Sequence, residues 1–198
     1  MNDCYLVPAR PSETQFREKM SRFISFAIPV GTPEEAKREA ARIANEYHDA
    51  RHVCYAYAIG KDRETTYSTD NGEPSGTAGR PILGQIVSAG VSDVVVIVVR
   101  YFGGIKLGTS GLVAAYREAA ANALEEAGRE EKVITRDIKV TFPYMAMNEV
   151  MKIAKSGDVK VVSQEFDNTC RIVFRVRQSS VEQIESRVAD IDGAIAEI

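Results

Sequence analysis

The segment VVRYFGGIKLGTSG, residues 98–111, combines two cations with a glycine-rich turn. It follows the apolar run Val94–Val99 and leads into a helical pattern that begins at Leu112. Glycines let a backbone approach a ligand closely, and the amides at a helix amino end attract anions. Arg100 and Lys106 would add charge-assisted hydrogen bonds to a phosphate. The same glycines could instead serve only to turn a strand into a helix, and the spacing matches neither the P-loop nor the dinucleotide fingerprint.

A second polar loop, STDNGEPSGTAGRP, covers residues 68–81. Asp70 and Glu73 could act as acid and base, or hold a metal between protein and phosphate, with Thr77 in the same loop. These residue types are also the ordinary chemistry of a chain reversal. Arg100 is either free for phosphate or paired internally with Asp70 or Glu73. The candidate phosphate- or nucleic-acid-binding residues are Arg80, Arg100, Gly103, Gly104, Lys106, Gly108 and Gly111.

His48, His52 and Cys54 stand close together in HDARHVCYAY. Two histidines four residues apart would share a helix face, as in zinc sites, but strand composition begins at His52. His52 and Cys54 would then lie on one face of a strand, where a nucleophilic pair is conceivable. A small buried core thiol is the alternative. We expect neither a structural metal nor a cofactor, and the sequence identifies no catalytic residue.

The pattern around these residues is that of alternating strands and helices. Strands are predicted at 22–30, 52–60, 65–68 and 92–101, and helices from Pro33, near Pro81 and at 112–126. Thr32 is the expected N-cap of the first helix, with Glu35 completing a capping box. The order is β-α-β-β-α-β-α. The cationic residues Arg10, Arg17, Lys19 and Arg22 are interpreted as a solvated arm.

The charged segment EEAGREEK, residues 125–132, has no apolar face and is interpreted as a linker. Beyond it the order β-α-β-β-α-β is the ferredoxin-like plan. The sequence therefore predicts an α+β protein with two domains, 1–130 and 131–198.

The composition of the chain limits the functions and locations that we expect. The net charge of −3 gives no overall attraction to nucleic acid, so any such contact needs a local patch. Three scattered cysteines indicate reduced thiols and a cytoplasmic location. The longest apolar stretch is far too short for a bilayer, and the amino end lacks a signal-peptide pattern, so no membrane contact is expected.

Two segments carry a family resemblance. STDNGEPSGTAGRP at 68–81 and VVRYFGGIKLGTSGL at 98–112, preceded by KMSRFI and DARHVCYAY, resemble the signature of the YigZ/IMPACT family. Asn71 and Ser110 depart from it, because the family often has a second acid and a second glycine there.

This resemblance implies a first domain similar to the second domain of a small-subunit ribosomal protein, and a ferredoxin-like second domain. It also implies a translation-associated regulatory protein that binds the ribosome or structured RNA. Protein partners without RNA contact, or an enzyme acting on a nucleotide or small phosphorylated molecule, are the alternative functions.

Overall fold

The structure, a computed structural model, describes residues 3–167 and 169–198. Met1 and Asn2, which the sequence places in the first domain, lie outside the described residues. The chain divides into two compact units: one covers Tyr5–Lys132, and the other covers Val133–Ile198 together with the residues up to Cys4.

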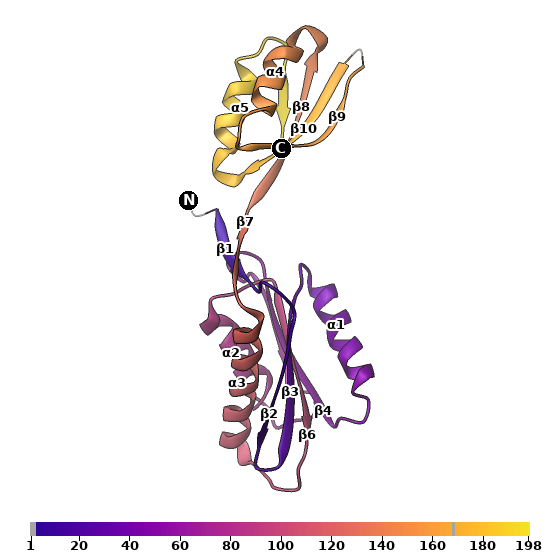
Figure 1. Cartoon of the computed structure of the whole chain (residues 1–198), viewed down its shortest axis with the longest axis vertical. Helices are drawn as coiled ribbons and strands as arrows, with labels where there is room; N and C mark the ends of the chain where they lie inside the picture. Colours follow the sequence, from indigo (N-terminus) through magenta and orange to yellow (C-terminus); the bar gives the residue numbers. More distant parts are fainter. Residues whose placement is uncertain (1–2, 168) are drawn as a thin grey trace. The chain divides into compact units, whose positions relative to one another are not determined.

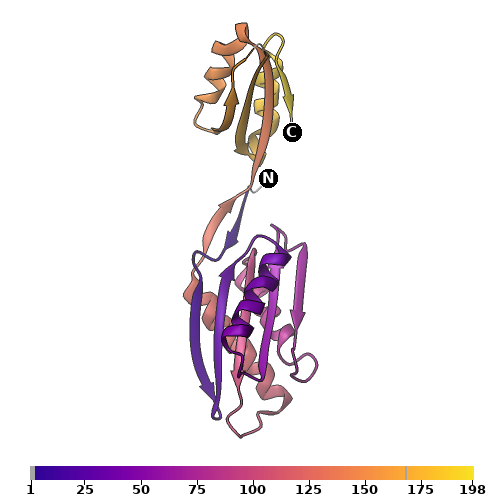
Figure 2. The ribbon, with the colours of Figure 1, turned by 90° about the vertical axis from the view of Figure 1, so that its right-hand side faces the viewer.

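The larger unit is built on a five-stranded antiparallel sheet. The strands follow the order β2-β3-β6-β4-β5. Their bounds are β2 Ser12–Glu18, β3 Ser21–Pro29, β4 His52–Ile59, β5 Thr65–Thr69 and β6 Val94–Tyr101. Helix α1 (Pro33–Glu46) packs on one face of this sheet, and α2 (Gly79–Ala89) and α3 (Gly108–Ala127) pack on the other (Figure 1). Figure 2 shows α1 lying across its face of the sheet.

The sequence of β6 explains why it is the central strand. Val94, Val96 and Val98 face the core under α2 and α3, whereas Val95, Ile97 and Val99 face the core under α1. Side chains alternate along a strand, so only a run that is apolar at every position can be buried on both faces. All six of these side chains are fully buried.

The amino end of α1 forms as its sequence indicates. The Oγ1 of Thr32 accepts a hydrogen bond from the amide of Glu35 at 3.2 Å. The Glu35 carboxylate accepts one from the amide of Gly31 at 2.7 Å. Pro33 occupies the first helical turn, where its missing N–H costs nothing.

Two segments interpreted as irregular are strands. Residues 12–18 form β2, whose polar sequence pairs with the apolar β3 along its whole length. The expected linker contains β7 (Glu130–Val133), which pairs with β1 (Cys4–Val7) in a two-stranded sheet. Both segments lack an apolar face of their own. Their pairing with a neighbouring strand therefore could not be predicted from a hydrophobic pattern.

The smaller unit has the predicted β-α-β-β-α-β order. Its strands are β8 Thr135–Pro143, β9 Val159–Glu165, β10 Thr169–Arg177 and β11 Ile195–Glu197. Its helices are α4 Met147–Ala154 and α5 Val181–Ala189, each preceded by a short 3-10 turn, η1 Tyr144–Ala146 and η2 Gln178–Ser180. The sheet order β11-β8-β10-β9 and the single core beneath α4 and α5 complete an α+β chain, which confirms the predicted fold class.

Candidate functional site

Strand register places Arg100 inside the larger unit. It continues the row Val94–Val96–Val98, so its side chain points to the face that α3 covers. Across the sheet it stands opposite Phe23 on β3 and opposite His52 on β4. Arg100 is 5% exposed. A cation so deep needs a partner, because an isolated charge is expensive to remove from water.

That partner is Glu73, from the loop that follows β5. The Arg100 Nη1 donates to Glu73 Oε1 at 2.6 Å, and both side chains are more than nine-tenths buried. The hydroxyl of Tyr116, on α3, donates to the same oxygen at 2.8 Å. This network joins β6, the 70–79 loop and α3. Of the two alternatives for Arg100, the structure has the internal pair, with Glu73 as the partner.

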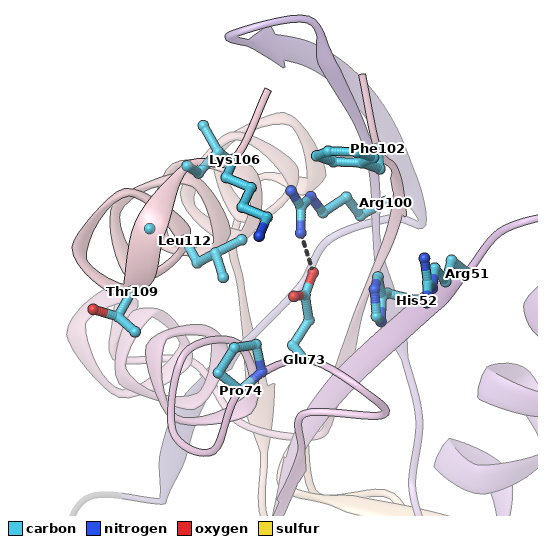
Figure 3. A pocket seen from close by; sticks show the side chains of 11 residues that line it. Arg51, His52, Glu73, Pro74, Arg100, Phe102, Lys106, Thr109 and Leu112 are labelled. Atoms are coloured by element: carbon cyan, nitrogen blue, oxygen red, sulfur yellow. Dashed lines mark hydrogen bonds and ion pairs between the residues drawn. The ribbon is translucent and has the colours of Figure 1, made fainter. Parts of the chain in front are cut away.

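This pair lines a cavity of about 360 Å³. Figure 3 shows the side chains around it. Arg51 and His52 lie on one side of Glu73, and Lys106 lies on the other. Its walls are otherwise mostly apolar and come from Pro74, Phe102, Leu107 and Leu112, with Gly108 and Thr109 at the start of α3. Three cations surround one carboxylate, so the cavity favours an anion.

The amino end of α3 forms part of this cavity and is not capped. Leu107 is the N-cap residue and makes no side-chain hydrogen bond, and the first turn contains no acidic residue. The amides at a helix start have no partner inside the helix, and the helix dipole makes that end electropositive. Lys106 and Arg51 have no ion-pair partner within residues 3–167 and 169–198. Their charges therefore remain available to a ligand.

His52 has a defined hydrogen-bonding state. Its Nδ1 lies 3.2 Å from the carbonyl oxygen of Asn71. Since a carbonyl oxygen can only accept, Nδ1 is the protonated nitrogen and the neutral ring keeps Nε2 as an acceptor.

Gly103 and Gly104 serve the geometry of the turn, whereas Gly108 and Gly111 lie at the start of α3. A Cβ at Gly103 would lie 2.1 Å from the backbone of Met20, and Gly104 and Gly108 have φ values of +91° and +74°. A Cβ at Gly111 would contact Leu107 at 3.2 Å. Gly108 also lines the cavity. The glycines thus shape the corner that presents Lys106 and the start of α3.

Asp70 organises the second loop. Its carboxylate accepts hydrogen bonds from the amides of Gly76, Ala78 and Gly79 at 2.7, 2.9 and 2.8 Å. Burial alone would raise the pKa of Asp70, but these three amides outweigh it, so the pKa lies below its usual value of 3.8. Thr77 is buried and donates to the carbonyl of Pro74 at 2.7 Å. These bonds fix the segment that delivers Glu73.

Replacing Asp70 with asparagine should remove a stabilisation that depends on pH. A carboxyl whose pKa is lowered by folding stabilises the fold above its unfolded pKa, and this stabilisation is lost as the pH falls through the folded pKa. We therefore expect Asp70→Asn to be less stable than the parent near neutral pH, with the difference shrinking below about pH 4. Urea unfolding at a series of pH values measures this.

Asp62→Asn is the matched control, since Asp62 is exposed and forms no hydrogen bond with the described residues. It should leave the stability profile unchanged. A constant difference between Asp70→Asn and the parent at every pH would contradict the role of the ionised carboxylate.

Cys54 does not have the environment of a nucleophile. Its thiol is fully buried and donates to the carbonyl of Asp70 at 2.8 Å. Burial raises the pKa of Cys54 to about 12, so the thiol stays protonated at neutral pH. His48 lies beyond the end of α1 and His52 on β4, so the two do not share a helix face. The described residues contain no cluster of three or more His, Cys, Asp or Glu side chains that could hold a metal.

Arg80 lies apart from this cavity. It lines a second depression with Gly76, at the α2–α3 face, together with Arg117. The structure therefore brings Arg100, Lys106, Gly108 and Glu73 together and separates Arg80 from them. Arg51, Phe102, Thr109 and Tyr116 were not among the predicted site residues, although DARHVCYAY offered Arg51 beside His52 as a signal.

No helix among the described residues has the length and hydropathy needed to cross a membrane.

The model of the Impact N-terminal domain matches residues 19–124, a range that includes the cavity, both loops and most of α3. IMPACT family member YigZ from Escherichia coli is 30% identical over 95% of this chain and 93% of its own length. An IMPACT family member from Haemophilus influenzae is 32% identical over 94% of this chain and 91% of its own. A crystal structure described as that of a hypothetical protein superposes with a TM-score of 0.77 at 29% identity, covering 99% of this chain and 97% of that one.

The family model covers more than half of the chain, and the two relatives match it along nearly its full length. The chain therefore belongs to the IMPACT family.

Proposed function

We propose that this protein is a translation-associated regulatory protein that binds structured RNA, including ribosomal RNA, at the cavity beside the start of α3. The observation that carries the proposal is the set of donors there that have no ion-pair or side-chain capping partner in the described part of the chain: Lys106, Arg51 and the first amides of α3. Phosphate contacts from such groups position a protein on RNA. The link to translation rests on the family resemblance.

The distribution of charge supports a local contact. With a net charge of −3, the chain has no general attraction for polyanions. At the cavity three cations face a single carboxylate, and that carboxylate is already paired with Arg100. Arg80 and Arg117 offer a second phosphate contact at the neighbouring depression for a longer RNA.

Reversing the charge at Lys106 should weaken RNA binding. We expect Lys106→Glu to lower the affinity for a fluorescein-labelled RNA hairpin by on the order of tenfold or more, because it removes a phosphate contact and adds repulsion. The slope of log affinity against log salt between about 50 and 200 mM should fall by at least about one unit. Fluorescence anisotropy in a salt series measures both.

Lys37→Glu is the matched control, because Lys37 is an exposed residue of α1 on the opposite face of the sheet. It makes the same change in net charge and should leave affinity nearly unchanged. Equal losses in the two variants would show that only net charge matters. Co-sedimentation with ribosomes at the same salt concentrations extends the test, and absence of RNA and ribosome binding at low salt would overturn the proposal.

A further inference from the structure

The cavity is larger than a phosphate contact requires. Its volume of about 360 Å³ lies within the range of small-molecule sites. Lys106 and the amino end of α3 supply the positive charge, while Leu112, Leu107, Pro74 and the half-exposed ring of Phe102 form apolar walls. An inorganic ion would leave these walls unused, so the occupant has a charged end and an apolar, planar or bulky end.

Polar groups with unused hydrogen-bonding capacity line the interior. Glu73 Oε1 accepts from Arg100 and Tyr116, but Oε2 has no hydrogen-bond donor among the described residues, although the side chain is 3% exposed. Of the five N–H donors of Arg100, two have partners: one goes to Glu73 and one to Ser21 Oγ at 3.4 Å. The Arg100 Nε is buried and has no partner within residues 3–167 and 169–198.

Buried polar atoms without partners are uncommon in folded proteins and indicate a ligand or a functional role. Among the described residues Arg100 Nε is such an atom, and the Glu73 carboxylate, whose Oε2 accepts from no donor there, stands beside the Arg100 guanidinium in a cavity with apolar walls. The Watson–Crick edge of an RNA base presents the complementary pattern, an acceptor next to a donor. Proteins that take an unstacked base into a pocket combine such edge contacts with stacking on apolar or aromatic side chains.

We propose that the cavity takes one unstacked nucleotide, with its phosphate at Lys106 and the start of α3. Its base lies between Phe102 and Leu112, and its edge hydrogen-bonds to Glu73 and Arg100. This inference rests on the proposed function and names the part of the RNA that the cavity binds. A looped-out, bulged or terminal nucleotide of a structured RNA meets this requirement, whereas a continuous duplex does not.

Free nucleotides test the inference on the intact chain. Isothermal titration with AMP, GMP, CMP and UMP is compared with titration of ribose 5-phosphate and inorganic phosphate. At least one nucleoside monophosphate should bind on the order of tenfold or more tightly than ribose 5-phosphate, since stacking and edge contacts need the base. Equal affinities for nucleotides and ribose 5-phosphate would overturn the inference.

Phe102→Ala separates base binding from folding, because the Phe102 side chain is 47% exposed. The variant should lose on the order of tenfold in nucleotide affinity while its melting temperature and its affinity for ribose 5-phosphate stay unchanged. Phe166→Ala is the matched control, since Phe166 is also 47% exposed and lies in the other unit. It should bind nucleotides like the parent.

The two proposals fail in different ways. In one outcome, RNA binding depends on Lys106, but nucleoside monophosphates bind no more tightly than ribose 5-phosphate and Phe102→Ala has no effect. This outcome overturns the inference and leaves the proposed function standing. Nucleotide binding that depends on Phe102 without any RNA binding supports the ligand class of the cavity and overturns the proposed function.

Discussion

Replacing Arg100 with methionine is expected to lower the free energy of unfolding by about 3–5 kcal/mol, the usual cost of breaking a buried ion pair by removing one partner. The carboxylate of Glu73 would remain buried, with Tyr116 as its donor and no ion-pair partner among the described residues. The loss should show as a lower midpoint in urea unfolding with an unchanged slope, because the surface exposed on unfolding stays the same.

The double variant Glu73→Gln, Arg100→Met is the control for this prediction. Glutamine keeps an oxygen that can accept from Tyr116 but carries no charge, so no uncompensated ion stays in the core. We expect it to recover a substantial part of the lost stability. An Arg100→Met variant within about 1 kcal/mol of the parent would mean that the pair is solvated and is not a structural brace.

The second large effect is expected at Gly103. In Gly103→Ala, the new Cβ would lie 2.1 Å from both the carbonyl carbon and the oxygen of Met20. Met20 and Lys19 form the turn between β2 and β3 with φ values of 68° and 43°, a tight two-residue hairpin. Because the clash involves backbone, no rotamer change relieves it. We expect a loss of about 3 kcal/mol, the upper part of the range for overpacking.

Gly84→Ala is the matched glycine control. Gly84 lies inside α2 and is exposed, and a Cβ added to it would have no atom within 4 Å outside its own helix backbone and chain neighbours. Alanine should there raise stability by about 0.5–1 kcal/mol through helix propensity. Thermal unfolding of both variants measures the two effects. A Gly103→Ala protein as stable as the parent would contradict the close approach of the two turns.

Local patterns predicted much of the fold. The apolar run at 94–99 identified the central strand, since only such a strand is buried on both faces. Thr32, Pro33 and Glu35 marked the start of α1 because capping is a local interaction. In contrast, β2 owes its existence to pairing with the adjacent β3 and β7 to pairing with the distant β1, and their polar sequences carry no sign of it.

The sequence predicted the part of the candidate site that lies in one continuous segment, but not the contacts between distant segments. Lys106, Gly108 and the amino end of α3 belong to one segment, so their proximity follows from the chain. The pairing of Arg100 with Glu73 depends on the register of β6 against β4 and on the path of the 70–79 loop. Neither can be derived from composition or spacing. The separation of Arg80 from Lys106 depends on tertiary packing in the same way.

The proposed function depends above all on the amino end of α3 and Lys106, which receive a phosphate of the bound RNA. The most direct measurement is an NMR titration of the ¹⁵N-labelled chain with a short RNA that carries an unpaired nucleotide. We predict that the largest amide shifts occur at Gly108, Thr109 and Ser110, with smaller ones at Arg51 and at Glu73 in the cavity wall. Saturable binding with shifts elsewhere and none at the start of α3 would contradict the claim.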